Sequence, residues 1–301
     1  MPQQSQKMAS INPIDVLLWT FRRDETDVIN LYNSLASLMQ ISTGSNMLNF
    51  GYWDENTSSP VEAQTALCKM IADMAELETA KNVLDVGSGF SEPATVWKTS
   101  FPHIEISCLN VNQGQLDLAS KILKNIQFSG KCNFSQIIHL VNSTATRLPF
   151  ADKTMDRVIA LESSQHFKPF SGFVSESKRI LKDNGILILA IPVMLHPTKS
   201  ELFKLGILSF TWSSEHYYLE ELKDNIESSG LKIITVDLIG PRVYEPLADY
   251  YMKNRQLLRP KILQQYPSHI EKILAKSLLK MKQVSENRTI DYALLKCVVE
   301  R

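Results

Sequence analysis

The stretch that decides the fold is Lys81-Asn82-Val83-Leu84-Asp85-Val86-Gly87-Ser88-Gly89-Phe90. A short apolar run ends in Asp85, two glycines follow, and Ser91-Glu92-Pro93 then starts a helix. A strand, a tight turn and a helix in this order present backbone N–H groups to a nucleotide-like ligand. The dinucleotide-binding fingerprint G-x-G-x-x-G does not fit, because Glu92 stands where its third glycine is needed. What fits is D-x-G-x-G, in which the acid precedes the glycines.

The composition of the chain is balanced in charge. Lysine and arginine together number 32, as do aspartate and glutamate, among 301 residues. A chain without net charge has no field that would attract nucleic acid or an anionic membrane. No apolar run approaches the roughly 20 residues of a membrane span, the N-terminus lacks a signal-peptide core, and the four cysteines have no metal-ligand spacing. We therefore expect a cytoplasmic protein with reduced thiols, no metal site and no nucleic-acid partner.

Strands and helices alternate at short spacing along the centre of the chain. This alternation predicts right-handed crossovers and a parallel sheet with helices on both faces. We predict an α/β fold with a doubly wound, mostly parallel seven-stranded sheet of the Rossmann-like kind, joined by N-terminal helices and helical lid insertions. The strands are expected at residues 82–86, 104–111, 137–141, 157–161, 186–191, 231–239 and 291–300.

The chain divides into three parts around this sheet. Residues 1–23 are expected to form a flexible tail, residues 24–78 the N-terminal helices with an aromatic segment, and residues 79–301 the main domain. The alternation breaks after the fifth strand, which places lid insertions at about 192–217 and 241–289. The aromatic segment, Phe50-Gly51-Tyr52-Trp53, fits either a hydrophobic plug beside the main domain or a lid over a ligand.

Polar residues stand at and just after the end of the second predicted strand, at the edge where an open parallel sheet binds its ligands. Nucleotide-binding folds usually place an acid here to accept from both ribose hydroxyls, and this chain has Asn110. A neutral amide can still accept from one hydroxyl and donate to another. Gln115 adds a second amide in the next helix, and Asn112 is expected to cap that helix.

A histidine follows the fourth predicted strand, in Glu162-Ser163-Ser164-Gln165-His166. An isolated histidine is more often structural than catalytic. The place of His166 at a strand's carboxyl end, with Glu162 just before it, favours a role in chemistry. An imidazole with a pKa near about 6.5 can take a proton at neutral pH.

These motifs span residues 81–191 and resemble those of the class I S-adenosylmethionine-dependent methyltransferases. D-x-G-x-G is similar to the first motif of that family, and Thr144–Val158 resembles its D-A-x-x-L-P-F…F-D-x-V stretch. The wider chain resembles the small-molecule branch of that family, and Phe50–Trp53 and Glu162–His166 most resemble its sugar O-methyltransferases of natural-product pathways. That branch includes sugar O-methyltransferases of natural-product pathways and sterol and tocopherol methyltransferases.

The resemblance implies S-adenosylmethionine as the cofactor and a small molecule as the acceptor. It places these residues around the cofactor: Asp85, Gly87, Ser88, Gly89, Asn110, Val111, Gln115, Thr144, Ala145, Glu162 and Tyr52. Leu148–Phe150 would form a wall beside the adenine. Thr144 stands where the family has an acid that accepts from the adenine amino group. That contact is left to the threonine hydroxyl, a backbone carbonyl or water.

The leading hypothesis is methyl transfer to a hydroxyl of a natural product. A hydroxyl loses its proton as its oxygen attacks the methyl group, and the family resemblance assigns the role of general base to His166. The substrate is expected to contact Trp53, Trp212, His216 and Tyr217. An exposed apolar N-terminal helix would favour a homodimer.

Several alternatives stay open at this point. An alkaloid-type amine could be methylated with little more than orientation, and a prenyl or sterol-like carbon could be methylated if Glu162, Tyr217 and Tyr218 stabilised a carbocation. A cofactor-binding module without turnover is a further alternative. The missing third glycine argues against a nicotinamide dehydrogenase, and the neutral charge argues against a nucleic-acid methyltransferase.

Overall fold

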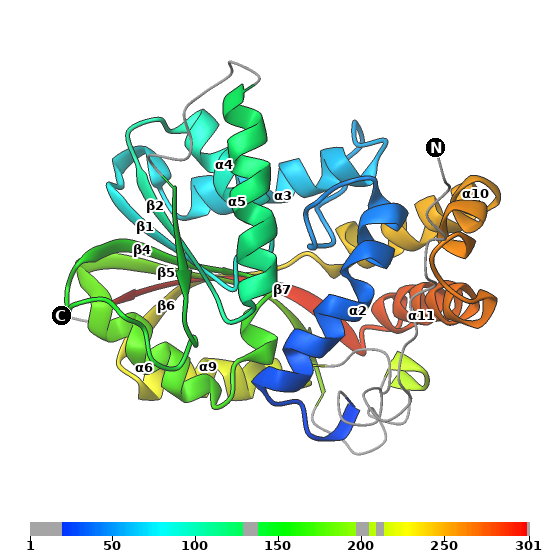
Figure 1. Ribbon diagram of the computed structural model, residues 1–301. Coiled ribbons are helices and arrows are strands. Elements are labelled where there is room, and N and C mark those ends of the chain that lie inside the picture. The colour runs from blue at the N-terminus through cyan, green and yellow to red at the C-terminus, as the bar shows by residue number, and fades with distance from the viewer. Residues whose placement is uncertain (1–19, 129–137, 197–204, 209–213, 300–301) are drawn as a thin grey trace.

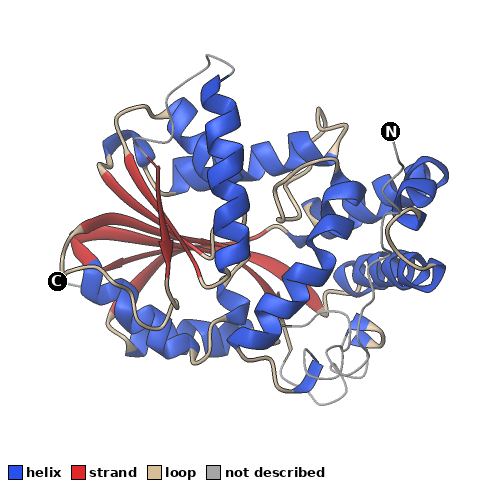
Figure 2. Cartoon of the chain, viewed as in Figure 1, coloured by secondary structure: helices blue, strands red, loops and turns tan. Residues whose placement is uncertain are grey.

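A seven-stranded sheet forms the centre of the protein in the computed structural model, which describes residues 20–128, 138–196, 205–208 and 214–299 (Figures 1 and 2). The strand order is β3-β2-β1-β4-β5-β7-β6, and β7 runs antiparallel to β5 and β6, while the other neighbouring pairs are parallel. This confirms the predicted fold class. The strands are β1 Asn82–Val86, β2 Glu105–Asn110, β3 Ile138–Asn142, β4 Met155–Leu161, β5 Leu181–Met194, β6 Leu231–Leu238 and β7 Ile290–Val299.

Helices cover both faces of the sheet because alternate strand residues point to opposite sides. Val83 packs into one apolar cluster, while its neighbours Leu84 and Val86 pack into another. The first cluster includes residues of α3 (Pro60–Met74), α4 (Glu92–Ser100) and α5 (Gln113–Phe128), and the second includes residues of α6 (Phe170–Ile180) and α9 (Leu219–Ser228). In Figure 1 these two groups lie above and below the sheet.

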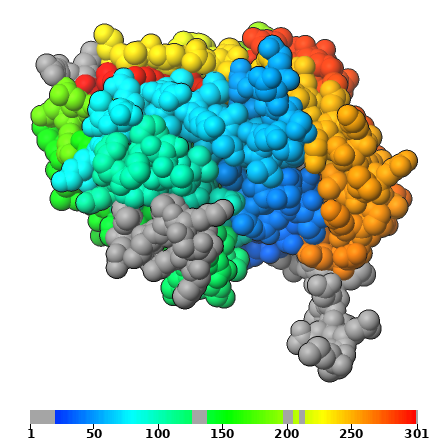
Figure 3. Space-filling model, turned by 90° about the horizontal axis from the view of Figure 1, so that it is seen from above, coloured from blue at the N-terminus to red at the C-terminus, as the bar shows by residue number. Residues whose placement is uncertain are grey.

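Three further helices lie together beside this main body: α2 (Glu25–Thr43), α10 (Tyr244–Leu263) and α11 (Ser268–Glu286). Asp24 caps α2 with a capping box, and Gly44, at φ 74°, ends it. Figure 3 shows the blue surface of the N-terminal region between the cyan surface of α3 and α4 and the orange surface of α10. Helix α2 is therefore positioned between the sheet domain and the C-terminal helices.

The predicted boundaries differ from the structure mainly at β5. That strand continues through Pro192 to Met194, because β7 pairs with it antiparallel as far as Met194 and Ile290. The first residues of the insertion predicted at 192–217 are therefore strand, and its residues 197–204 and 209–213 lie outside the described residues. Of the predicted tail at 1–23, residues 1–19 lie outside them too. Residues 241–289 contain α10 and α11.

The short helices are η1 (Leu77–Thr79), η3 (Ser164–His166) and η4 (Gly240–Arg242). Within the described ranges, no helix combines the length and the apolar character that crossing a membrane requires.

Candidate active site

Two adjoining cavities lie beyond the carboxyl ends of the parallel strands. The sheet-edge cavity is enclosed by the strand ends, α2 and the loop Asn46–Asn49. The helix cavity is enclosed mainly by α2, α10 and α11. Ten of the residues predicted for the site line the sheet-edge cavity: Asp85, Gly87, Ser88, Gly89, Asn110, Val111, Gln115, Ala145, Glu162 and His166.

The two glycines of the D-x-G-x-G turn have different reasons to be glycine. Gly87 has φ 75°, and a Cβ atom there would lie 2.3 Å from the Cβ of Ser163. Ser163 is held in that position because its hydroxyl donates to the Val86 carbonyl at 2.5 Å. Gly89 has φ 55°, but its nearest neighbour to such a Cβ is Leu48 Cδ1, at 3.6 Å. Gly87 thus lets the turn pack against the loop after β4, while Gly89 leaves room beside the cavity.

The lining of the sheet-edge cavity is acidic. Its lining includes the carboxyl groups of Glu25, Asp85 and Glu162, and no lysine or arginine among the described residues. Burial raises the pKa of Asp85 to about 7, and its Oδ2 has no hydrogen-bond partner in the described structure. Such a cavity suits a cationic ligand, whereas a dinucleotide pyrophosphate would need a cation or a cluster of N–H donors.

Amide side chains line the cavity at the end of β2. The Asn110 amide nitrogen donates to the Gly89 carbonyl at 3.2 Å and to Gln115 Oε1 at 2.8 Å. The Asn110 oxygen accepts from the backbone N–H of Asn112 at 2.9 Å. The nitrogen of the Gln115 side chain is buried without a partner among the described residues. These groups form a fixed polar site for ligand hydroxyls, with Asn110 held by its neighbours and Gln115 available as a donor.

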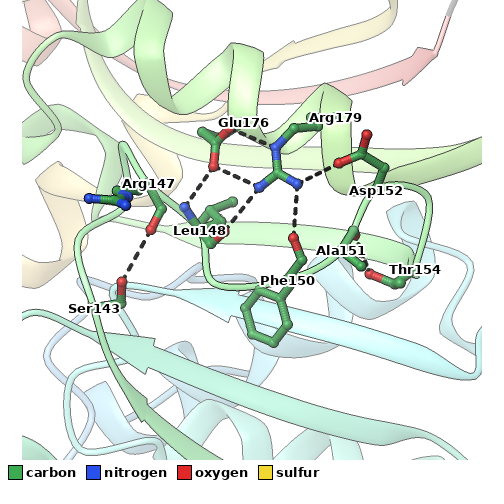
Figure 4. Close-up of polar contacts among 9 residues, drawn as sticks. All are labelled: Ser143, Arg147, Leu148, Phe150, Ala151, Asp152, Thr154, Glu176 and Arg179. Atoms are coloured by element: carbon green, nitrogen blue, oxygen red, sulfur yellow. Dashed lines mark hydrogen bonds and ion pairs between the residues drawn. The ribbon is translucent and has the colours of Figure 1, made fainter.

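The loop after β3 is held in place from α6. Arg179 donates to the carbonyls of Phe150 at 2.8 Å and Leu148 at 3.0 Å, and Glu176 accepts from the Leu148 N–H at 2.8 Å (Figure 4). Leu148 is buried in the core, and Leu148–Phe150 does not line either cavity. The expected adenine wall is therefore an anchored turn, and Ser143 and Ala145 take the lining position.

Glu162 and His166 lie where the two cavities meet, since both residues line both cavities. The Glu162 carboxylate accepts from the Phe50 N–H at 2.9 Å and from the Tyr292 hydroxyl at 2.8 Å. Burial is nonetheless dominant and raises the pKa of Glu162 to about 8. His166 Nε2 lies 3.2 Å from the hydroxyl oxygen of Tyr32, a residue of α2 that the sequence analysis missed.

The imidazole of His166 is neutral over the physiological pH range. Burial, helped by the positive charge of Arg23, lowers its pKa to about 4. Its Nδ1 is buried and has no partner among the described residues, and its Nε2 lies beside the Tyr32 hydroxyl. A neutral ring with an accessible nitrogen can accept a proton.

The helix cavity has a volume of about 570 Å³. Its walls are largely apolar, with Leu35, Leu247 and Leu278 from three different helices, and no lysine, arginine or aspartate among the described lining residues. The apolar face of α2, which suggested a dimer contact, lines this cavity through Leu31, Leu35 and Leu38. The reason for expecting a dimer is thereby removed, and the oligomeric state stays a prediction.

Five predicted residues do not line either cavity. The ring of Trp53 is buried against Tyr250, with the centroids 5.7 Å apart, and Tyr250 lines the helix cavity in its place. The other residues are Tyr52, Thr144, His216 and Tyr217, while Trp212 lies outside the described residues. The loop before the aromatic segment lines the cavities instead of Tyr52 and Trp53. Asn49 lines both cavities, and its buried side-chain amide has no partner in the described structure.

Comparison with known proteins identifies the fold and its cofactor. Residues 84–189 match the family model described as a methyltransferase domain. The chain carries a methyltransferase domain of the class that uses S-adenosylmethionine. Erythromycin 3''-O-methyltransferase of Saccharopolyspora erythraea is 25% identical to this methyltransferase over 252 residues, which are 79% of either chain. Other curated relatives are named 27-O-demethylrifamycin SV methyltransferase, (S)-coclaurine N-methyltransferase and sterol 24-C-methyltransferase.

Solved structures share the whole architecture of the methyltransferase. The mycolic acid cyclopropane synthase CmaA1, solved with SAH and CTAB, has a TM-score of 0.73 at 15% identity, covering 96% of this chain and 99% of its own. The cyclase SpnF has a TM-score of 0.73 at 20% identity, covering 92% and 97%. SpnF is named as a cyclase, so likeness to these structures shows the fold alone.

The sheet-edge cavity fits S-adenosylmethionine, which carries a positive sulfonium and an ammonium group. The unpartnered Oδ2 of Asp85 and the unpartnered amide of Asn49 are available to polar groups of the cofactor. Asn110 and Gln115 line the same cavity with amide groups that can bond hydroxyls, and their contact with the ribose stays a prediction. The absence of basic side chains from the described lining suits a ligand without phosphate.

Proposed function

We propose that this methyltransferase methylates a hydroxyl group on a neutral, largely apolar small molecule bound in the helix cavity. The observation that carries the proposal is the position of His166, a neutral imidazole that lines both cavities. A base at that junction can reach an acceptor hydroxyl while the acceptor oxygen faces the cofactor.

The class of acceptor follows from the lining of the helix cavity. Its volume of about 570 Å³ lies in the range of pockets for drug-sized ligands. A phosphate or carboxylate on the acceptor would be buried there without a lysine or arginine among the described residues, which is costly. Serine and tyrosine hydroxyls such as those of Ser42, Tyr250 and Tyr251 could hydrogen-bond a few polar groups.

The protein's own contribution is mainly positioning. S-adenosylmethionine, when bound, supplies a methyl group that its sulfonium has already activated. Residues of the two cavities then need to align the acceptor oxygen with that methyl group and to exclude water. His166 Nε2 takes the hydroxyl proton, and the Tyr32 hydroxyl beside it shares that hydrogen bond. A base as weak as this imidazole suffices only because the methyl group is activated.

Replacing His166 tests this function. Transfer of isotope-labelled methyl groups to a panel of lipophilic alcohols and phenols identifies an acceptor first. His166→Ala should then reduce turnover by about 100-fold or more, the scale of a positioned base. Its affinity for S-adenosylmethionine, measured by calorimetry, should change little, because the imidazole acts on the acceptor. The rising limb of the pH–rate profile is expected near pH 4, where His166 titrates, rather than near 6.5.

His216→Ala is a matched control, because His216 also has a pKa lowered to about 4 by burial but does not line either cavity. It should keep nearly full turnover. Wild-type turnover in His166→Ala would exclude the role of base. Joint loss of melting temperature and activity would make His166 structural.

A second candidate is methylation of carbon, for which Glu162 provides a specific observation. Its carboxyl group lies at the junction of the cavities and bonds Tyr292, so it could stabilise a cation that forms on an alkene carbon. Mass spectrometry of the labelled product separates an ether from a new carbon–carbon bond. Absence of label from every product would favour a protein that binds the cofactor without transferring its methyl group.

A further inference from the structure

The sheet-edge cavity has a reactive end and a far end. Glu162, His166 and Tyr32 line both cavities, so under the proposed function the methyl group of the cofactor would lie beside them. The strand order β3-β2-β1-β4 carries the other lining residues away from this end, first to Asn110 at the end of β2 and then to Ser143 and Ala145 after β3. The base of the nucleoside therefore belongs beside Ser143 and Ala145.

Thr144 lies at this far end but does not line the cavity. Its hydroxyl donates to the carboxylate of Glu25, and it also lies 3.1 Å from the hydroxyl of Thr146. The threonine donor is thus directed at an acid from another part of the chain. Glu25 itself lines the cavity from α2, whereas the other described carboxyl groups of the lining belong to the sheet: Asp85 lies near the end of β1, and Glu162 directly follows β4.

We propose that Glu25 is the acceptor for the adenine amino group of the cofactor. An exocyclic amino group offers N–H donors, and an ionised carboxylate is a strong acceptor for them. The acid comes from α2, and the hydroxyl of Thr144 orients it by donating a hydrogen bond. Thr144 stands at the position where the methyltransferases that this chain resembles have an acid. Glu25 thereby selects adenine over a base with a carbonyl in the same position.

Helix α2 is held firmly enough to present this carboxylate. Asn33 accepts from the Asn112 amide at 2.9 Å, and Ser37 donates to Gln265 at 2.7 Å. The Tyr266 hydroxyl donates to the Ser34 carbonyl at 2.8 Å. Because these contacts do not involve Glu25, removal of its charge should leave the helix in place.

The role of Glu25 can be tested by binding measurements alone, with two ligands that differ only in the nucleoside base. Calorimetry would compare S-adenosylhomocysteine with S-inosylhomocysteine, in which a carbonyl replaces the amino group. The wild-type protein should bind the adenosyl compound at least about tenfold more tightly, the scale of one hydrogen bond to a charged group. Glu25→Gln should weaken the adenosyl compound by about tenfold and bring the two affinities within about twofold, because glutamine can also donate to the carbonyl.

Two further variants distinguish recognition of adenine by Glu25 from simple anchoring of α2. Asn33→Ala removes another anchor of the helix and should leave the adenosyl preference unchanged. Adding Thr144→Asp to Glu25→Gln should restore that preference, because the acid returns to the loop after β3. Equal weakening of both compounds in Glu25→Gln, or a wild-type protein without preference, would overturn the assignment. The proposed role of Glu25 concerns cofactor binding only, so it does not depend on which acceptor is methylated.

Discussion

The two cavities of this methyltransferase are built in opposite ways. The sheet-edge cavity is polar and acidic, and most of its lining comes from the ends of neighbouring strands and the short segments that follow them. The helix cavity is apolar, and its lining comes from α2, α10 and α11, which are far apart in the sequence. Under the proposed function, local backbone turns would hold a cofactor of constant chemistry, whereas helical side chains, which can vary without disturbing the sheet, would hold the acceptor.

The largest expected effect is at Gly87, in the sheet-edge cavity. Gly87→Ala should reduce affinity for S-adenosylmethionine by more than about 100-fold and lower the melting temperature, because its Cβ would overlap Ser163 at 2.3 Å. Gly89→Ala is the matched control, since its Cβ has room and only the φ of 55° is unfavourable. It should lose no more than about tenfold, the scale of left-handed strain. Calorimetry and thermal melts compare the two, and equal effects would show that space is not what distinguishes the glycines.

The next effect separates the cavities. Leu278→Asp places a carboxylate in the apolar wall of the helix cavity and should reduce kcat/KM by about 100-fold, because an apolar acceptor would then bury that charge. Affinity for S-adenosylmethionine should stay within about twofold. The neighbouring Leu279 is 46% exposed, so Leu279→Asp serves as a control with nearly normal kinetics. A large loss of cofactor affinity in Leu278→Asp would contradict the division into two independent cavities.

The smallest effect concerns the pH dependence of the sheet-edge cavity. Without cofactor, the pKa of Asp85 is raised to about 7. A cationic ligand favours the carboxylate, so binding releases a proton and affinity for S-adenosylmethionine should fall as pH decreases below about 7. Asp85→Asn should weaken binding by about tenfold at pH 8, as expected for loss of one charged partner. It should also flatten the pH profile. S-adenosylhomocysteine, which lacks the sulfonium charge, should show a weaker dependence.

The same carboxyl group has an opposite effect on stability. The native protein holds the Asp85 proton up to about pH 7, whereas the unfolded chain releases it near 3.8. The free energy of unfolding therefore decreases as pH rises between these values. Asp85→Asn should raise the melting temperature of the cofactor-free protein at pH 8 and leave it nearly unchanged at pH 4. An unchanged melting temperature at pH 8 would mean that burial of this charge costs little.

The sequence predicts the sheet-edge cavity better than the helix cavity for a physical reason. Asp85 and Asn110 stand at strand ends and Gly87 in the turn that follows β1, and the conformation of these segments is encoded within a few residues. Leu35 and Leu278 look like ordinary core positions of amphipathic helices, and only the packing of those helices leaves a space between them.

Several contacts of the site also depend on long-range packing. Tyr32 reaches His166, and Glu25 reaches Thr144, because α2 crosses the strand ends. Arg179 and Glu176 could not be assigned to the loop after β3 without knowing that α6 lies beside it. The resemblance to methyltransferases led to Tyr52 and Trp53, but Asn49 and Tyr250 line the cavities instead.

Helix α2 is a wall of both cavities, with Glu25 at one and Leu35 at the other and Tyr32 lining both. A ligand that holds this helix in place lowers the conformational entropy that a second ligand must still remove. We therefore expect cofactor and acceptor, bound as proposed, to be thermodynamically linked, each raising the affinity of the other by the same factor. After methyl transfer, release of either product would loosen the common wall and favour release of the other.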